Sequence, residues 1–114
     1  MLSKGFWVNL RKDIFPEKDI GIALCSKWNK QALIKLEEIG FEGKFVERIV
    51  NSKNLFVSLD YILHSHRWLE TEQEGERFIA DGTAGQIDSN YPLGFYGFIS
   101  QAPESLRKIY NYSE

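Results

Sequence analysis

Apolar side chains recur at helical spacing near the start of the chain. Between Phe6 and Phe15 they fall three or four positions apart, as on one face of an amphipathic helix. Ser3 is a residue type that caps helix starts, and Pro16 cannot continue a helix because its nitrogen carries no hydrogen. The pattern therefore predicts a first helix over 6–15.

A second, stronger helical pattern follows the short apolar run 20–24. Its apolar face consists of Trp28, Ala32, Leu36 and Ile39. Gly40 comes directly after this face, at a position where glycine commonly ends a helix. We therefore predict a helix that ends near Gly40, with Cys25 in its first turn and with Trp28 and Leu36 buried.

Turn residues divide the rest of the chain into short segments, several of which favour strands. The predicted strands lie at 44–50, 67–71, 77–80 and 94–99. Segment 55–63 fits either a strand or a short helix, 51–54 is predicted to be a turn and 82–92 a loop. Pro103 suits the first turn of a terminal helix that runs to Tyr110. Helices followed by strands indicate an α+β fold, with N-terminal helices packed on an antiparallel sheet.

Composition supports a packed, soluble domain. With 114 residues, of which 43% are hydrophobic, the chain is expected to form a single compact domain over 1–114. The net charge is −2 without a basic cluster, which argues against a nucleic-acid partner. A single cysteine indicates a reducing compartment, and no apolar stretch approaches the ~18 residues of a membrane span. We therefore expect a cytoplasmic protein with no membrane partner.

The turn between the segments 67–71 and 77–80 decides which side chains meet. A loop of four residues, 72–75, places His66 opposite Asp81 and Glu70 opposite Arg77. Directly opposed residues hold their Cβ atoms about 4.5–5.5 Å apart, so an imidazole would lie within reach of a carboxylate. We favour this register because it pairs the opposite charges of Glu70 and Arg77.

A shorter loop gives a different pairing. With two residues in the loop, Glu74 and Gly75, His66 faces Thr83 and Glu70 faces Ile79. In either register, side-chain alternation places His64, His66 and Trp68 on one face of the strand. Trp68 is therefore expected to support His66 by packing.

Cys25, His66 and Asp81 have the residue types of an acyl-transfer site. A thiolate is the nucleophile in such chemistry, and a neighbouring imidazole takes the thiol proton. The N-terminus of a helix stabilises the anion, and a carboxylate behind the imidazole fixes its tautomer. Each residue alone has a structural interpretation, because a lone Cys or a His beside Trp is more often packed in a core, and Asp81-Gly82 is an ordinary turn sequence. The hypothesis therefore depends on their combination.

The order of these motifs resembles the papain-like and transglutaminase-like cysteine superfamily. The chain has a cysteine at the start of an amphipathic helix, then a strand, then "HRWLE", a turn and "FIADGTAGQ". The resemblance covers about 20–86 and implies a papain-like/transglutaminase-like core with a Cys–His–Asp site. It implies that Cys25 is the nucleophile, His66 the general base and Asp81 the residue that orients it.

The resemblance is incomplete at the cysteine end. Thr83 and Gln86 match the tail of the last motif, as substrate-binding or supporting residues. Leu24 precedes the cysteine where a small residue is common, and Asp19 stands where papain-like proteases place a glutamine as oxyanion donor. Beyond the backbone N–H of Cys25, no oxyanion donor is identified.

The leading prediction is a small cysteine acyl-transfer enzyme acting on a protein or peptide amide, with no cofactor and no metal. Peptidase, glutamine deamidase and transglutaminase share the same first half-reaction, so the triad does not distinguish them. One alternative is a catalytically inactive binding module of the same fold, in which the aromatic segment 91–98 offers a recognition surface. A weaker alternative is a zinc hydrolase, in which His64 and His66 would join Cys25 and Asp81 around the metal.

Overall fold

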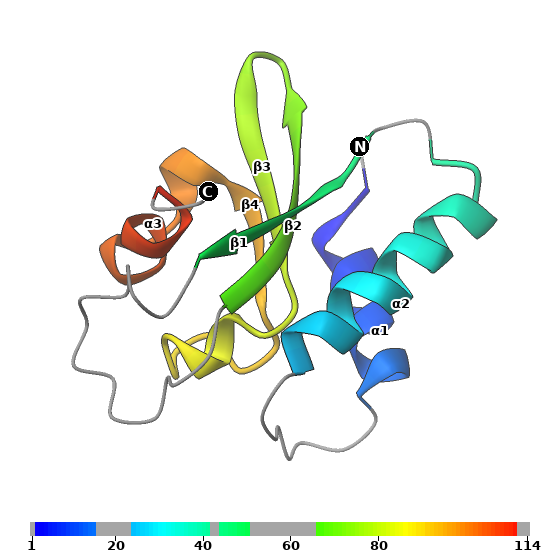
Figure 1. Ribbon diagram of the computed structural model, residues 1–114, viewed down its shortest axis with the longest axis horizontal. Coiled ribbons are helices and arrows are strands. Elements are labelled where there is room, and N and C mark those ends of the chain that lie inside the picture. Colours follow the sequence, from blue (N-terminus) through cyan, green and yellow to red (C-terminus); the bar gives the residue numbers. More distant parts are fainter. Residues whose placement is uncertain (1, 16–23, 42–43, 51–65, 112–114) are drawn as a thin grey trace.

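One antiparallel sheet separates two groups of helices (Figure 1). The computed structural model describes residues 2–15, 24–41, 44–50 and 66–111. Within these ranges the helices are α1 (Lys4–Ile14), α2 (Leu24–Glu38) and α3 (Glu104–Tyr110), and the strands are β1 (Val46–Val50), β2 (His66–Gln73), β3 (Glu76–Asp81) and β4 (Phe95–Phe98). The predicted α+β class, with N-terminal helices and an antiparallel sheet, is confirmed. No helix in the described ranges is long and apolar enough to cross a membrane.

The cap that begins α1 and the glycine that ends α2 are those that the sequence predicts, although α1 spans Lys4–Ile14 rather than 6–15. The hydroxyl of Ser3 accepts a hydrogen bond from the backbone N–H of Phe6 at 3.2 Å, which caps α1. After α2, Gly40 adopts a positive φ of 69°, and the N–H of Phe41 bonds back to the carbonyl of Leu36 at 3.0 Å. This left-handed glycine ends the helix. Cys25 is the second residue of α2, as predicted.

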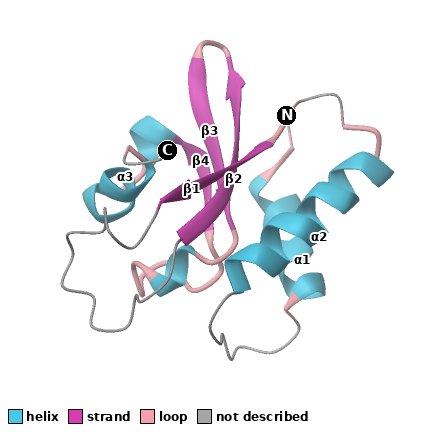
Figure 2. Cartoon of the chain, viewed as in Figure 1, coloured by secondary structure: helices cyan, strands magenta, loops and turns pink. Residues whose placement is uncertain are grey.

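The strands run in the order β1-β2-β3-β4, and each pairs with the next in the antiparallel sense (Figure 2). In the β2–β3 hairpin Gln73 pairs with Glu76, so the turn has two residues, Glu74 and Gly75. The predicted four-residue loop is therefore wrong. Glu74 and Gly75 both have positive φ, 54° and 78°, the backbone of a tight turn that follows the twist of the strands.

Other element boundaries differ from the predictions by a few residues. The strand predicted at 94–99 is Phe95–Phe98, and the predicted loop 82–92 contains a short 3₁₀ turn, Ala84–Gln86. Pro103 lies just before α3 rather than within its first turn. The predictions for 16, for 20–23 and for 51–64, which include His64, lie outside the described residues.

The sheet has a separate apolar cluster on each of its two faces. The cluster under α1 and α2 consists of Trp7, Leu10, Phe15, Trp28, Ala32, Leu36, Leu69, Phe78, Ala80 and Tyr96. The cluster under α3 consists of Val50, Trp68, Ile79, Ala84, Phe95, Ala102, Leu106, Ile109 and Tyr110. The alternation of β2 assigns these faces, since Leu69 belongs to the first cluster and Trp68 to the second. His66 therefore points to the face of α3.

Candidate functional site

Asp81, the last residue of β3, has a fully buried carboxylate that accepts four hydrogen bonds. Its Oδ2 atom accepts from His66 Nε2 at 2.7 Å and from the Tyr110 hydroxyl at 2.9 Å. Its Oδ1 atom accepts from the backbone N–H and the hydroxyl of Thr83 at 3.1 and 3.3 Å. The exposed fraction of Asp81 is 0%. This set of donors satisfies both oxygens of the buried carboxylate.

The contact between His66 and Asp81 is confirmed, although the predicted register is not. Leu69 pairs with Ala80, so Asp81 follows opposite Trp68 rather than opposite His66. His66 is a diagonal neighbour of Asp81 on the same face, a separation that long side chains can span. The same diagonal joins Glu70 to Arg77, whose guanidinium donates two hydrogen bonds to the Glu70 carboxylate at 2.9 and 3.0 Å.

Trp68 packs against the histidine, as the sequence predicts. Its ring lies 5.9 Å from that of His66 with an interplanar angle of 28°, and none of its surface is exposed. Its indole N–H donates to Glu70 at 3.1 Å. Because the indole is fixed at both its ring face and its nitrogen, it limits the rotation of the imidazole beside it.

The turn after Asp81 is held from the opposite face of the sheet. A Cβ atom on Gly82 would stand 2.3 Å from the ring of Trp28, so only glycine allows this close approach. The carbonyl of Gly82 accepts a hydrogen bond at 2.7 Å from the buried side chain of Arg11. Trp28 also donates to the carbonyl of Ala80 at 3.2 Å. Residues of α1 and α2 thus fix the backbone that carries Asp81.

Cys25 reaches the same end of the sheet from α2. Figure 1 shows the first turn of α2 beside the start of β2. Burial raises the pKa of the Cys25 thiol, a backbone hydrogen bond with Arg67 lowers it, and the negative charge of Asp81 raises it again. The thiol therefore lies next to the residue that follows His66, within electrostatic range of the carboxylate that His66 contacts.

The net shift of the Cys25 pKa is upward, which decides the resting state of the thiol. Its exposed fraction is 5%, and desolvation outweighs the backbone hydrogen bonds with Arg67 and Ser26. A thiol with a raised pKa is protonated at neutral pH. The cysteine in this conformation therefore needs a base to remove its proton before it can act as a nucleophile.

The charged residues around α2 and β1 form a second set of contacts near Cys25. The carboxylate of Glu47 accepts from Asn29 at 2.8 Å and from Arg67 at 3.1 Å. Asn29 also donates to the carbonyl of Trp68 at 3.3 Å. Asn29 lies one helical turn after Cys25, so these bonds tie the start of α2 to both β1 and β2.

The two residues at the tail of the motif, Thr83 and Gln86, have different outcomes in the structure. Thr83 is fully buried and donates twice to Asp81, which gives it a defined supporting role. Gln86 lies half-buried at the end of the 3₁₀ turn Ala84–Gln86. Its place in the predicted site stays a prediction.

Sequence reasoning missed Tyr110 and Arg11. Tyr110 comes from the last turn of α3, and burial raises the pKa of its hydroxyl well above the usual range, with the charge of Asp81 acting in the same direction. The hydroxyl therefore stays protonated and acts as a donor. The apolar spacing of α3 marks a buried helix, but no local pattern indicates which tyrosine meets Asp81.

The zinc alternative has no support in the described part of the chain. There, no group of three or more His, Cys, Asp and Glu side chains is arranged to hold a metal ion. His64, which the alternative requires, lies outside the described residues.

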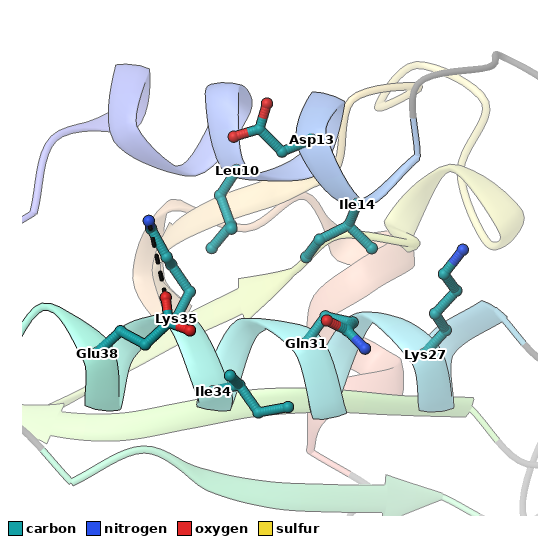
Figure 3. Close-up of a pocket in the computed structure, with 8 residues that line it drawn as sticks. All are labelled: Leu10, Asp13, Ile14, Lys27, Gln31, Ile34, Lys35 and Glu38. Carbon is teal, nitrogen blue, oxygen red and sulfur yellow. Dashed lines mark ion pairs between the residues drawn. The ribbon is translucent and has the colours of Figure 1, made fainter.

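A groove of about 460 Å³ lies between α1 and α2, apart from this cluster of residues (Figure 3). Leu10 and Ile14 of α1 point towards α2, and Ile34 is one of the lining residues that α2 contributes. Charged residues of both signs stand around it, including an ion pair between Lys35 and Glu38 at 4.0 Å. None of its lining residues takes part in the hydrogen bonds around Asp81.

No family model, no curated protein and no solved structure matches this chain. Conclusions about its function therefore depend on the residues and their geometry.

Proposed function

We propose that this chain is a small cysteine acyl-transfer enzyme with a papain-like/transglutaminase-like core, acting on a protein or peptide amide. The observation that carries the proposal is the 2.7 Å contact between His66 and Asp81. At the same end of the sheet, the negative charge of Asp81 contributes to the raised pKa of the Cys25 thiol. A nucleophile at a helix start, an imidazole and an orienting carboxylate are the three groups that such chemistry uses.

The hydrogen bond to Asp81 assigns the two nitrogens of His66. Nε2 contacts the carboxylate, which leaves Nδ1 for the proton exchange with Cys25 that the proposal requires. In the reaction Nδ1 takes the thiol proton while the sulfur forms a bond to the amide carbonyl carbon. The carbon–nitrogen bond then breaks, and the leaving ammonia or amine takes the proton from Nδ1.

The product of this half-reaction is a thioester on Cys25. Attack by water gives a carboxylic acid, as in a peptidase or a deamidase, and attack by a second amine gives a new amide, as in a transglutaminase. The backbone N–H of Cys25 at the start of α2 supplies one donor to the oxyanion, where the helix dipole also favours negative charge. Because the thiol is protonated at rest, its proton must be transferred to His66 as a step of the reaction.

A second candidate is a catalytically inactive binding module of the same fold. The raised pKa and the burial of Cys25 favour it, since an activated nucleophile usually has a lowered pKa. The two candidates differ in whether the thiol reacts through His66.

The test compares two reagents on the same variants. A glutamine-mimicking peptide chloromethyl ketone requires the site, whereas iodoacetamide needs only a thiolate. We expect the ketone to label the wild type on Cys25, and Cys25→Ala and His66→Ala to lose labelling. His64→Ala is the matched control and is expected to have a mild effect. Circular dichroism checks that each variant folds.

Two outcomes would contradict the proposal. Labelling that is lost in His64→Ala but survives in His66→Ala would show that His66 is not the base. Absence of ketone labelling, with iodoacetamide reacting only above the pH range of an ordinary thiol, would favour the binding module. A metal assay on protein purified without chelator tests the zinc alternative separately.

A further inference from the structure

A chain of hydrogen bonds leads from the buried side of His66 to the last helix. From His66 Nε2 it passes to Asp81 Oδ2 at 2.7 Å, and from there to the Tyr110 hydroxyl at 2.9 Å. The backbone carbonyl of Tyr110 in turn accepts from Arg77 Nη2 at 2.8 Å. Arg77 also donates to the side chain of Asn111 at 3.0 Å. The end of α3 is thus attached to β3 at two points.

The same guanidinium leads back to the histidine by another route. Arg77 donates to both oxygens of Glu70 at 2.9 and 3.0 Å, and Glu70 accepts from the indole of Trp68 at 3.1 Å. The indole stacks on His66, and its ring lies 4.9 Å from that of Tyr110. The contacts therefore close into a ring of six residues: His66, Asp81, Tyr110, Arg77, Glu70 and Trp68.

We propose that Tyr110 is a positioning residue for His66, acting through Asp81, and that Arg77 and Glu70 hold Tyr110 in place for this role. The proposal rests on the function proposed above for Cys25 and His66. It extends the site from the hairpin to α3, which the sequence motif does not include.

The role follows from the acceptor that Tyr110 shares with His66. Both donors bond to the same oxygen, Oδ2 of Asp81, while Thr83 occupies Oδ1. With both oxygens bound on fixed partners, the carboxylate cannot rotate away from Nε2. The tyrosine hydroxyl also takes part of the negative charge of Oδ2, which weakens the attraction of Asp81 for a proton on His66.

The decisive variant is Tyr110→Phe, which removes only the hydroxyl. The ring that packs on Trp68 and the carbonyl that binds Arg77 both remain. Tyr96→Phe is the matched control, because the Tyr96 hydroxyl is also removed from a buried ring but donates to the carbonyl of Leu93 at 2.8 Å. Tyr96 belongs to the cluster under α1 and α2, on the other face of the sheet.

The first measurement needs no catalytic activity. In protein with ¹⁵N-labelled histidine, the His64→Gln variant identifies the signals of His66. We expect the Nε2 nitrogen and its attached proton to shift downfield in Tyr110→Phe, because Asp81 Oδ2 is then left to a single donor. We expect Tyr96→Phe to leave these signals unchanged. Unchanged His66 signals in Tyr110→Phe would overturn the inference.

The second measurement is the pH profile of labelling by the peptide ketone. We expect the acid limb of the profile in Tyr110→Phe to move to higher pH by about 0.5–1 unit, as the loss of one hydrogen bond implies. The rate at the plateau is expected to fall about fivefold. A lowered melting temperature with an unmoved profile would show a merely structural role and would overturn the inference.

The two measurements separate this inference from the proposed function. If wild-type labelling does not depend on His66, the proposed function fails, and the histidine signals still decide whether Tyr110 positions the imidazole. Should Tyr110→Phe not fold, Arg77→Lys replaces it, because a lysine cannot bind Glu70 and the Tyr110 carbonyl at once. The same signals are then expected to shift in the same direction, and no shift would overturn the inference.

Discussion

The two faces of the sheet are stabilised in different ways. Under α1 and α2 the contacts are mainly aromatic, with Trp7 stacked on Tyr96 at 5.7 Å and near parallel at 7°. Under α3 the central contacts are directional hydrogen bonds to two buried carboxylates, Asp81 and Glu70. The energy of apolar packing depends on the volume and the surface area of the side chains that are buried. The free-energy cost of burying a carboxylate depends instead on each hydrogen-bond donor that it contacts.

Because one face is held by aromatic packing and the other by hydrogen bonds, we expect the two faces to have different roles. The aromatic face gives stability and holds the backbone of Gly82, while the polar face holds His66 in one orientation. We therefore expect substitutions on the aromatic face to change the free energy of unfolding, and substitutions on the polar face to change the chemistry of Cys25 as well.

The largest expected effect is on reactivity, from Asp81→Asn. An amide has nearly the same shape but donates as well as accepts, so it no longer fixes the tautomer of His66. We expect ketone labelling of Cys25 to fall by about 10³-fold or more while circular dichroism shows the fold intact. Asp88→Asn is the control, because Asp88 accepts from Ser105 and Asn90 outside the cluster. Equal effects of the two substitutions would show that Asp81 has no special role.

A pair of tryptophan variants compares the two faces directly. Trp7 and Trp68 are 1% and 0% exposed, so Trp7→Ala and Trp68→Ala are each expected to cost about 3–5 kcal/mol of unfolding free energy. Denaturant titration measures this cost. Only Trp68→Ala is expected to shift the histidine signals of His66. If Trp7→Ala shifts them equally, the two faces are not independent.

A smaller cost is expected from Gly82→Ala. The added methyl would meet the ring of Trp28 at 2.3 Å, and overpacking of this kind costs about 1–3 kcal/mol. Because the displaced turn carries Asp81, labelling is expected to fall as well. Gly5→Ala is the control, since its nearest neighbour is 3.7 Å away and alanine favours a helix. A neutral Gly82→Ala would show that Trp28 can move aside.

The smallest effect concerns the stability of the protein at alkaline pH. Since burial raises the pKa of Cys25 in the folded state, the unfolded chain loses this proton first as pH rises. The contribution of Cys25 to stability is therefore complete below the ordinary thiol pKa and is lost as pH rises towards the folded value. Each unit of raised pKa corresponds to about 1.4 kcal/mol.

Cys25→Ser isolates this contribution, because the tyrosines that titrate at higher pH remain. We expect the unfolding free energy of the wild type to decrease more steeply than that of Cys25→Ser above the ordinary thiol range. Parallel curves would show that the thiol pKa is not raised.

The sequence by itself determined the elements whose signals are local. Cys25 lies in the first turn of α2, Gly40 ends this helix with a positive φ, and Trp28 and Leu36 are buried. Capping, helical periodicity and the conformational freedom of glycine all act within a few residues. The strand alternation likewise placed His66 and Asp81 on one face.

The hairpin shows why the predicted contact survived a wrong register. A shift of one residue turns every side chain to the opposite face, but a shift of two preserves the faces. The difference between the predicted and observed registers is two, so His66 still reaches Asp81 and Glu70 still reaches Arg77, each along a diagonal. The charge argument selected the correct partners and the wrong turn, because directly opposed and diagonal pairs both bring charges together.

Only the tertiary structure decided which distant groups complete the cluster. Tyr110 contacts Asp81 from 29 positions away, and Arg11 contacts Gly82 from 71 positions away. Such contacts depend on how α1 and α3 dock on the sheet, which is set by the summed packing of two apolar clusters and not by any short pattern. The sequence indicated that Asp81 would orient a histidine, and the docking of α3 determined which hydroxyl holds Asp81.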